Sequence, residues 1–219
     1  MSRKCLRGWR MASAAALLTV CSALVAACTS TPADPDAAYI ETLQAERAAK
    51  DAAFRSGQNS PILAAQRNLF LPLKYFPADP VYAVPASFAP SPVRTPLQML
   101  TSNGKLRDME RVGTLEFTLK GRALSLGAFV ETGTPPSRLF VPFTDLTSGT
   151  ETYPAGRYLE IDRRASGAYV IDFNRAFHPY CYYNADYDCP YPPQGNRLPI
   201  PVRAGEKLAE STISAPSRD

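Results

Sequence analysis

Alternation of apolar and polar residues between Gly113 and Val130 constrains the fold of this chain more than any other feature. In GTLEFTLKG, the apolar Leu115, Phe117 and Leu119 alternate with polar or charged residues. Gly121 ends this segment, and the next one, RALSLGAFV, alternates again. A period of two predicts strands with one buried and one wet face, and the glycine predicts a turn between them.

Four further short segments predict strands, and stretches containing Gly and Pro separate them. These segments are RLFVPF (138–143), GRYLEID (156–162), AYVIDF (168–173) and LPIPVRAG (198–205). Several short strands with this punctuation are typical of an antiparallel barrel or sandwich, so we expect a mainly β (α+β) domain. Strands and helices do not alternate along the sequence, which argues against a dinucleotide-binding fold.

Helix-forming residues precede the strands. Asp36 predicts the N-cap, Gly57 predicts the end, and Glu46 and Lys50 are spaced for an i,i+4 ion pair. A narrow apolar face predicts that this helix packs on the β domain, with a partner-binding helix as the alternative. The residues of that face are Ile40, Leu43 and Phe54.

The stretch from Pro72 to Pro96 contains seven prolines in 25 residues. This density excludes a long helix or a central strand, because proline has no N–H to donate. The stretch is also rich in large apolar residues, so we expect an extended edge segment packed on the core. Before it, Ser60-Pro61 predicts the start of a second short helix. After it, residues 97–109 are expected to form a surface excursion that turns at Asn103-Gly104.

The first 27 residues have the composition of an export signal. Residues 11–27 carry no charge and follow a basic start formed by Arg3, Lys4, Arg7 and Arg10. The sequence LVAAC then resembles a lipobox, with Val25 where leucine is usual. We therefore expect cleavage before Cys28 and stable lipid anchoring through this cysteine. An uncleaved anchor helix and ordinary signal-peptide cleavage are the alternatives.

The remaining chain divides into a flexible tether (28–37), a single mostly-β domain (38–210) and a disordered tail (211–219). Thr29, in place of Asp after the cysteine, predicts delivery to the periplasmic face of the outer membrane in a host with two membranes. Four of the 24 lysines and arginines precede Cys28, so 20 basic and 20 acidic residues remain. This neutrality provides no charged field for nucleic acid. The expected partners are the membrane and an unknown envelope protein or small ligand.

The segment HPYCYYNADYDC contains the residues best suited to chemistry. Cys181 and Cys189 are eight apart, and in an exported protein such a pair predicts a disulfide contributing about 2–3 kcal/mol. The alternative is a metal site formed by His178, Cys181, Asp186 and Cys189, although this spacing matches no common zinc motif. We expect no cofactor and no catalytic residue, because there is one histidine and no Gly-x-Ser-x-Gly elbow. The rival hypothesis is an envelope hydrolase or metal-dependent enzyme that uses His178, Asp172 and the two cysteines.

Aromatic residues are concentrated in the same segment. They are Phe177, Tyr180, Tyr182, Tyr183, Tyr187 and Tyr191. Tyrosine combines a flat apolar face with a polar tip, which suits sugars, peptides and protein partners. The alternative is a lid whose tyrosines pack onto the domain. We expect a non-catalytic, lipid-anchored binding or structural module that uses this loop.

Several blocks of the chain together resemble one known family. LKYFPADPVYAV, VGTLEFTLKG, RLFVPFTDLTSGTETYPAGRYLEID and the block from VIDFNRAFHPYC to PVRAGEK are similar to the domain-of-unknown-function family numbered 1684. The resemblance implies one domain, and the family pattern usually has Asn where this chain has His178. It also implies a polar set that forms a site or fixes loops to strands: Asp145, Arg157, Asp172, Asn174, Asn196 and Glu206. Together with His178, Tyr180 and Tyr183, these are the candidate ligand-binding residues.

Overall fold

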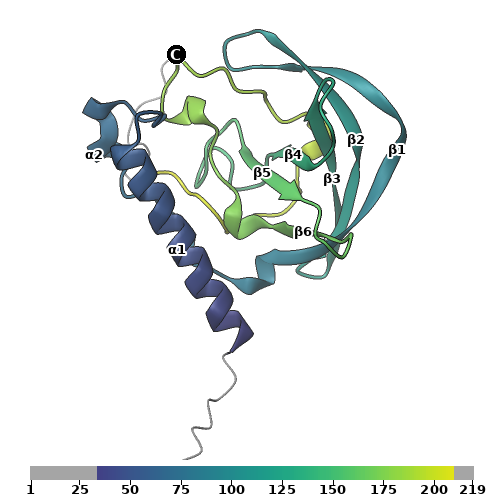
Figure 1. Cartoon of the computed structure of the whole chain (residues 1–219), viewed down its shortest axis with the longest axis horizontal. Coiled ribbons are helices and arrows are strands. Elements are labelled where there is room, and N and C mark those ends of the chain that lie inside the picture. The colour runs from purple at the N-terminus through teal and green to yellow at the C-terminus, as the bar shows by residue number, and fades with distance from the viewer. Residues whose placement is uncertain (1–33, 210–219) are drawn as a thin grey trace, which may run out of the picture. The chain divides into compact units, whose positions relative to one another are not determined.

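Six antiparallel strands form one sheet that curls into a nearly closed barrel (Figure 1). The computed structural model describes residues 34–209, which belong to one compact unit. The strands are β1 (Ala83–Leu100), β2 (Leu106–Leu119), β3 (Arg122–Glu131), β4 (Arg138–Phe143), β5 (Arg157–Asp162) and β6 (Tyr169–Asp172). Their order in the sheet is β5-β4-β3-β2-β1-β6. This arrangement confirms the predicted mainly β, antiparallel architecture.

Two helices and several single turns complete the described chain. The helices are α1 (Pro35–Ser56) and α2 (Arg67–Phe70). The 3-10 turns are Ala64–Gln66, Pro80–Tyr82, Phe173–Arg175, Tyr180–Tyr182 and Gln194–Asn196. No helix within residues 34–209 has the length and apolar character needed to span a bilayer. The predicted export signal, Cys28 and the tail 211–219 lie outside the described residues, and so does the tether up to residue 33.

The two alternating segments form the β2–β3 hairpin, as predicted. Leu115 of β2 lies opposite Leu126 of β3. Lys120 and Gly121 make the turn with φ values of 49° and 75°, which suit a two-residue type I′ turn. Leu115, Leu119 and Leu126 have no exposed surface and belong to the main core. Removing each such side chain from water contributes about 1.5–3 kcal/mol.

The second half of the proline-rich stretch belongs to β1, which lies between β2 and β6 in the strand order. The predicted edge position is therefore wrong at Ala86, which pairs with both strands, but holds for residues 87–96, which lie beyond the pairing with β6. The short β6 pairs only with residues 83–86 of β1. Pro92 lies where the register with β2 shifts, between Pro90 and Thr95. Pro90, Pro92 and Pro96 all lie beyond the last residue paired with β6. They therefore occupy a bulge or a part of the strand with a strand neighbour on one side only, which are the places where a sheet tolerates proline.

The predicted surface excursion at residues 97–109 is also wrong. These residues form the end of the β1–β2 hairpin, and Leu97 pairs with Met109. Met99 and Met109 are 3% and 2% exposed, because they form a small core with Phe129. The turn itself is where the sequence predicts it: Gly104 has a φ of 74° and donates its N–H to the carbonyl of Thr101.

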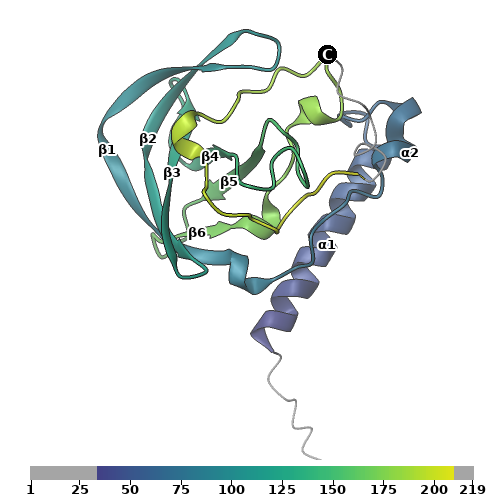
Figure 2. The same cartoon turned by 180° about the vertical axis from the view of Figure 1, so that it is seen from behind.

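The predicted strand at residues 198–205 does not form. Leu198 donates its N–H to the carbonyl of Thr144, and Leu146 donates to the carbonyl of Ile200. Pro199 and Pro201 have no N–H, so the segment cannot build a regular ladder. Both views show it as an extended strip that crosses the space enclosed by the sheet (yellow-green to yellow; Figures 1 and 2).

Helix α1 has its predicted end but a different start. Asp34, rather than Asp36, is the N-cap and accepts the N–H of Asp36, so the helix includes the last three residues of the expected tether. Gly57 is the C-cap, as predicted. Leu43 and Phe54 are buried, whereas Ile40 is half-buried.

Two local predictions at the N-terminal segment are wrong. Glu46 and Lys50 do not pair with each other, because each reaches a partner on the barrel side: Arg175 and Glu206. Ser60 does not open a helix. Its hydroxyl instead donates to the carbonyl of Phe54 and accepts the N–H of Ile62, which fastens the chain after the end of α1.

Candidate functional site

The predicted polar residues are buried and form three groups, the first two of which meet where Arg157 donates to the carbonyl of Glu206. Asp145 and Arg157 form the first, and Glu206, His178 and Tyr183 form the second. Asp172 and Asn174 form the third, while Asn196 acts alone. Apart from Tyr180, every one of the predicted ligand-binding residues is buried.

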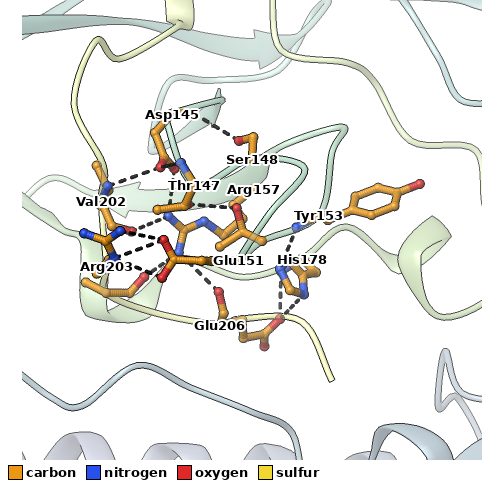
Figure 3. A network of polar contacts seen from close by, with 12 residues as sticks. Asp145, Thr147, Ser148, Glu151, Tyr153, Arg157, His178, Val202, Arg203 and Glu206 are labelled. Carbon is orange, nitrogen blue, oxygen red and sulfur yellow. Dashed lines mark hydrogen bonds and ion pairs between the residues drawn. The ribbon is translucent and has the colours of Figure 1, made fainter. Parts of the chain in front are cut away.

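The first network fastens the extended segment 198–205, here called the C-terminal strip, to the barrel. The guanidinium of Arg157 is fully buried and donates to Asp145 Oδ2 at 2.9 Å and to the carbonyl of Val202 at 2.7 Å. It also donates to the carbonyls of Ala204 and Glu206. Asp145 Oδ1 accepts the N–H of Val202 at 3.2 Å, so both partners hold the same strip (Figure 3). Because the prolines of the strip prevent a ladder, this charged pair takes the place of strand pairing.

The second network is centred on the carboxylate of Glu206. Oε1 accepts from Lys50 Nζ at 2.6 Å, and Oε2 accepts from the hydroxyl of Tyr183 at 2.8 Å and the backbone N–H of His178 at 2.7 Å. Burial raises the pKa of Glu206, but the ammonium of Lys50 and the donated hydrogen bonds outweigh it and the net pKa lies below the usual value. Glu206 is therefore a charged anchor for α1, the Tyr-rich segment and the C-terminal strip.

His178 lies in the same interior. Its side chain is 1% exposed, Nε2 accepts the backbone N–H of Tyr153 at 3.3 Å, and Nδ1 faces Glu206 Oε2 at 3.8 Å (Figure 3). This arrangement assigns the ring proton to Nδ1. Burial lowers the pKa of His178 to about 3, so the ring is neutral. With both nitrogens facing protein groups, His178 is not placed to exchange a proton with a ligand.

The third network joins α1 to the end of β6. The hydroxyl of Tyr39 donates to Asp172 at 2.8 Å and accepts from Asn174 Nδ2 at 3.0 Å. Asp172 also accepts the N–H of Asn174, and Arg175 pairs with both Asp172 and Glu46. The network therefore docks the helix through polar groups, which supplements its small apolar face.

Asn196 fixes the last 3-10 turn to the sheet. Its Oδ1 accepts the N–H of Gly127 at 2.7 Å, and its Nδ2 donates to the carbonyls of Gly127 and Pro142 at 2.9 and 2.8 Å. A Cβ on Gly127 would lie 3.1 Å from Asn196 Oδ1, so a side chain there would be a tight fit and would push against this contact. Asn196 thus has all its hydrogen-bonding capacity directed at the backbone.

The aromatic side chains of residues 177–191, here called the Tyr-rich segment, include both buried and exposed rings. Tyr183 is 3% exposed and its ring meets those of Phe54 and Phe70 edge-on. Tyr180 is 40% exposed, and its ring lies 5.2 Å from that of Tyr187. Part of the segment therefore covers the domain, and part of it faces solvent.

The exposed part borders an open cavity of about 810 Å³. Its aromatic lining comes from strands and from the Tyr-rich segment: Phe140, Tyr158, Phe177, Tyr180 and Tyr187. Its cationic side chains are Lys50, Arg107 and Arg138. Its carboxylates are Glu131, Glu160, Asp186 and Asp188. Of the predicted ligand-binding residues, Tyr180 is the one that lines this cavity.

The cavity contains side chains that sequence reasoning missed. Phe140 is the clearest case, because its neighbours Leu139 and Val141 are fully buried in the core and Phe140 points to the opposite face. An aromatic residue on the wet face of a strand was the available signal. Lys50 was identified as a helix residue, but its distant partner Glu206 could not be derived from helical spacing.

The two cysteines lie next to each other at the margin of the cavity. The backbone N–H of Cys181 donates to Sγ of Cys189 at 3.1 Å, and both are free thiols in this structure. The disulfide stays a prediction. Hydrogen bonding from the Cys189 thiol lowers the pKa of Cys181 to about 7, which favours its thiolate form near neutral pH. Within residues 34–209, no group of three or more His, Cys, Asp or Glu side chains is arranged to hold a metal ion.

A nearly closed antiparallel barrel, held by buried polar networks and covered by an N-terminal helix, defines the class of protein. Residues 68–207 match the family described as Protein of unknown function (DUF1684), and the chain belongs to that family. It is also similar to the uncharacterized protein from gene locus rrnAC0354 of Haloarcula marismortui, whose structure was solved by solution NMR. The identity is 35% and the TM-score 0.62, over 78% of this chain and 95% of that chain. No curated protein matches the chain.

Proposed function

We propose that the protein is a non-catalytic, lipid-anchored module of the cell envelope that binds a small ligand in the cavity beside the Tyr-rich segment. The observation that carries this proposal is the cavity of about 810 Å³ with five aromatic rings in its lining. Its volume lies within the range of about 300–1,000 Å³ that small-molecule sites occupy. Its walls combine apolar faces with charged groups, which is the usual composition of such sites.

The proposed ligand contacts come from Tyr180 and Tyr187. Both rings line the cavity, and neither hydroxyl has a hydrogen-bond partner among residues 34–209. Tyr180 is exposed and Tyr187 is half-buried, and tyrosine rings supply flat contact area at low entropic cost. The buried tyrosine of the segment, Tyr183, acts as a structural residue, because its hydroxyl is used by Glu206.

Saturation binding of envelope sugars, short peptides and small amines to the full-length protein tests the proposal. Tyr180→Ala with Tyr187→Ala is expected to weaken binding at least about tenfold, because each ring contact contributes on the order of 1 kcal/mol. Tyr191→Ala is the matched control, since Tyr191 is exposed in the same segment but does not line the cavity. Equal losses in both variants, or no binding of any compound, would contradict the proposal.

Lipid anchoring at Cys28 is supported by the basic start, the uncharged run and the lipobox-like sequence. Metabolic labelling with an alkyne-tagged fatty acid tests it. The full-length chain is expected to incorporate the label and fractionate with membranes, whereas Cys28→Ala is expected to do neither. Label in Cys28→Ala, or unlabelled wild-type chain, would contradict the assignment.

The proposed Cys181–Cys189 disulfide is supported by the proximity of the two residues. Native alkylation before and after reduction tests it. Protein recovered from the envelope is expected to resist alkylation until it is reduced. Immediate modification of Cys181 in that protein would contradict the disulfide and would agree with a thiol whose pKa is lowered.

A further inference from the structure

The cationic side chains that line the cavity have partners within the protein, whereas two of its carboxylates have none among residues 34–209. Its three cations already have partners: Lys50 bonds Glu206 at 2.6 Å, Arg107 bonds the carbonyl of Asp188 at 2.7 Å, and Arg138 bonds Asp162 at 2.8 Å. Arg138 also reaches Glu160 at 3.2 Å. Arg107 also lies 3.9 Å from the carboxylate of Asp188, so each of these three cations faces a carboxylate of the described chain.

Two carboxylates of the cavity have no such partner. The side chains of Glu131 and Asp186 make no hydrogen bond or ion pair with any residue in the range 34–209. Both residues are exposed, so water solvates them in the free protein. Unpaired negative charge thus remains after every ion pair of the cavity has been counted.

The aromatic lining reinforces this preference. Ring faces carry negative potential and attract cations within about 6 Å of the centroid. The protein already uses one ring in this way, because Lys50 Nζ lies 4.9 Å from the centroid of Phe177. Tyr180 and Tyr187 offer further rings, and no Lys or Arg of the described chain is stacked on either of them.

We infer that the ligand of this cavity is an organic cation: an ammonium or guanidinium group on an apolar stem. The cation would be paired by Glu131 and Asp186, and the stem would lie against Tyr180 and Tyr187. This inference rests on the proposed function and specifies its ligand class. A free small amine and a basic side chain of a peptide share this chemistry.

Calorimetric titration of the full-length protein in nonionic detergent tests the inference. The probes are the capped tripeptide Gly-Lys-Gly, the same peptide with acetylated lysine, capped Gly-Glu-Gly, and choline. The lysine peptide is expected to bind at least about fivefold more tightly than its acetylated form, since each carboxylate pair contributes a few-fold in affinity. The preference is expected to shrink with added salt. Choline binding alone would indicate a free amine, and peptide binding alone would indicate a basic peptide.

Glu131→Gln with Asp186→Asn is expected to remove the preference for the lysine peptide and to leave the acetylated peptide unaffected. Asp36→Asn with Glu41→Gln is the matched control, because these α1 carboxylates are exposed, outside the cavity and make no side-chain contact within the described chain. The lysine and acetyl-lysine peptides could instead bind with equal affinity, with Tyr180→Ala weakening the binding of both. That result would overturn the inferred preference for a cation and leave the proposed function standing. Binding of none of the probes would overturn the inference, whereas failure of the wider ligand screen would overturn the proposed function.

Discussion

The barrel interior and the cavity beside the Tyr-rich segment use polar residues in opposite ways. Inside the barrel, Asp145, Arg157 and Glu206 are buried and spend their hydrogen-bonding capacity on backbone and side chains of the same chain. In the cavity, Glu131 and Asp186 are exposed and have no protein partner within residues 34–209. A buried polar group must be satisfied by the fold, whereas an exposed one can be left for a ligand. The first set therefore contributes to stability, and the second set is the one to which we assign binding in the proposed function.

Removal of the buried guanidinium of Arg157 is the strongest test of this difference between the barrel interior and the cavity. Arg157→Met would leave Asp145 and the carbonyls of the C-terminal strip without their donor inside the barrel. We expect the free energy of unfolding to fall by about 3–5 kcal/mol in urea denaturation. Arg203→Met is the control, because Arg203 pairs with Glu151 on the surface and should cost at most about 1 kcal/mol. Similar losses of stability in the two variants would show that the buried Asp145–Arg157 pair does not hold the C-terminal strip in place.

A second test uses the single histidine. Burial lowers the pKa of His178 to about 3 in the folded protein, against about 6.5 in an unfolded chain. Because the folded pKa is lowered, the unfolded chain takes up the proton first as the pH falls below about 6.5, and stability is lost. Between about pH 7.5 and 5 we expect a loss of about 2 kcal/mol in the free energy of unfolding.

With the cysteines oxidised, so that Cys181 does not titrate near pH 7, His178→Asn should remove this pH dependence, since no other histidine is present and most carboxylates titrate lower. Unfolding of both proteins is measured at several pH values across the window. An unchanged slope in His178→Asn would mean that another group is responsible and that His178 is not buried in neutral form.

A third test compares two tyrosines of one segment. Tyr183→Phe removes a hydroxyl that donates to the charged Glu206, and we expect a loss of about 1–3 kcal/mol in unfolding free energy. Tyr180→Phe removes a hydroxyl without a partner in the described chain, and we expect a change within about 0.5 kcal/mol. The opposite order would assign the structural role to the exposed tyrosine and contradict its place in a binding wall.

The sequence predicted the parts of this fold that depend on local periodicity. The β2–β3 hairpin and the end of α1 at Gly57 follow from alternation and from helix-end signals. The C-terminal strip could not be derived, because its position depends on Arg157, which lies more than 40 residues earlier in the chain. Local rules placed Pro90 and Pro96 correctly outside a two-sided ladder, but they could not show that β6 covers residues 83–86 of the same strand.

The candidate site was predicted less well, for a related reason. Family resemblance and composition drew attention to polar residues, but these residues are buried and satisfied. Of the predicted ligand-binding residues, Tyr180 is the one that lines the cavity. The other walls come from β2, β3, β4, β5 and α1, whose side chains converge only after the sheet has curled. No spacing along the sequence encodes that convergence.

The smallest expected effect is the sharpest test of the comparison. Glu131→Gln with Asp186→Asn should change the free energy of unfolding by less than about 0.5 kcal/mol, because neither carboxylate has a partner to lose. Glu206→Gln, which disturbs a buried carboxylate bonded to Lys50, should cost several times more. If the double variant instead lost about 1 kcal/mol or more, the two carboxylates would have a structural partner. Glu131 and Asp186 would then be held by the fold rather than left to pair with a cation, even though the cavity itself would remain.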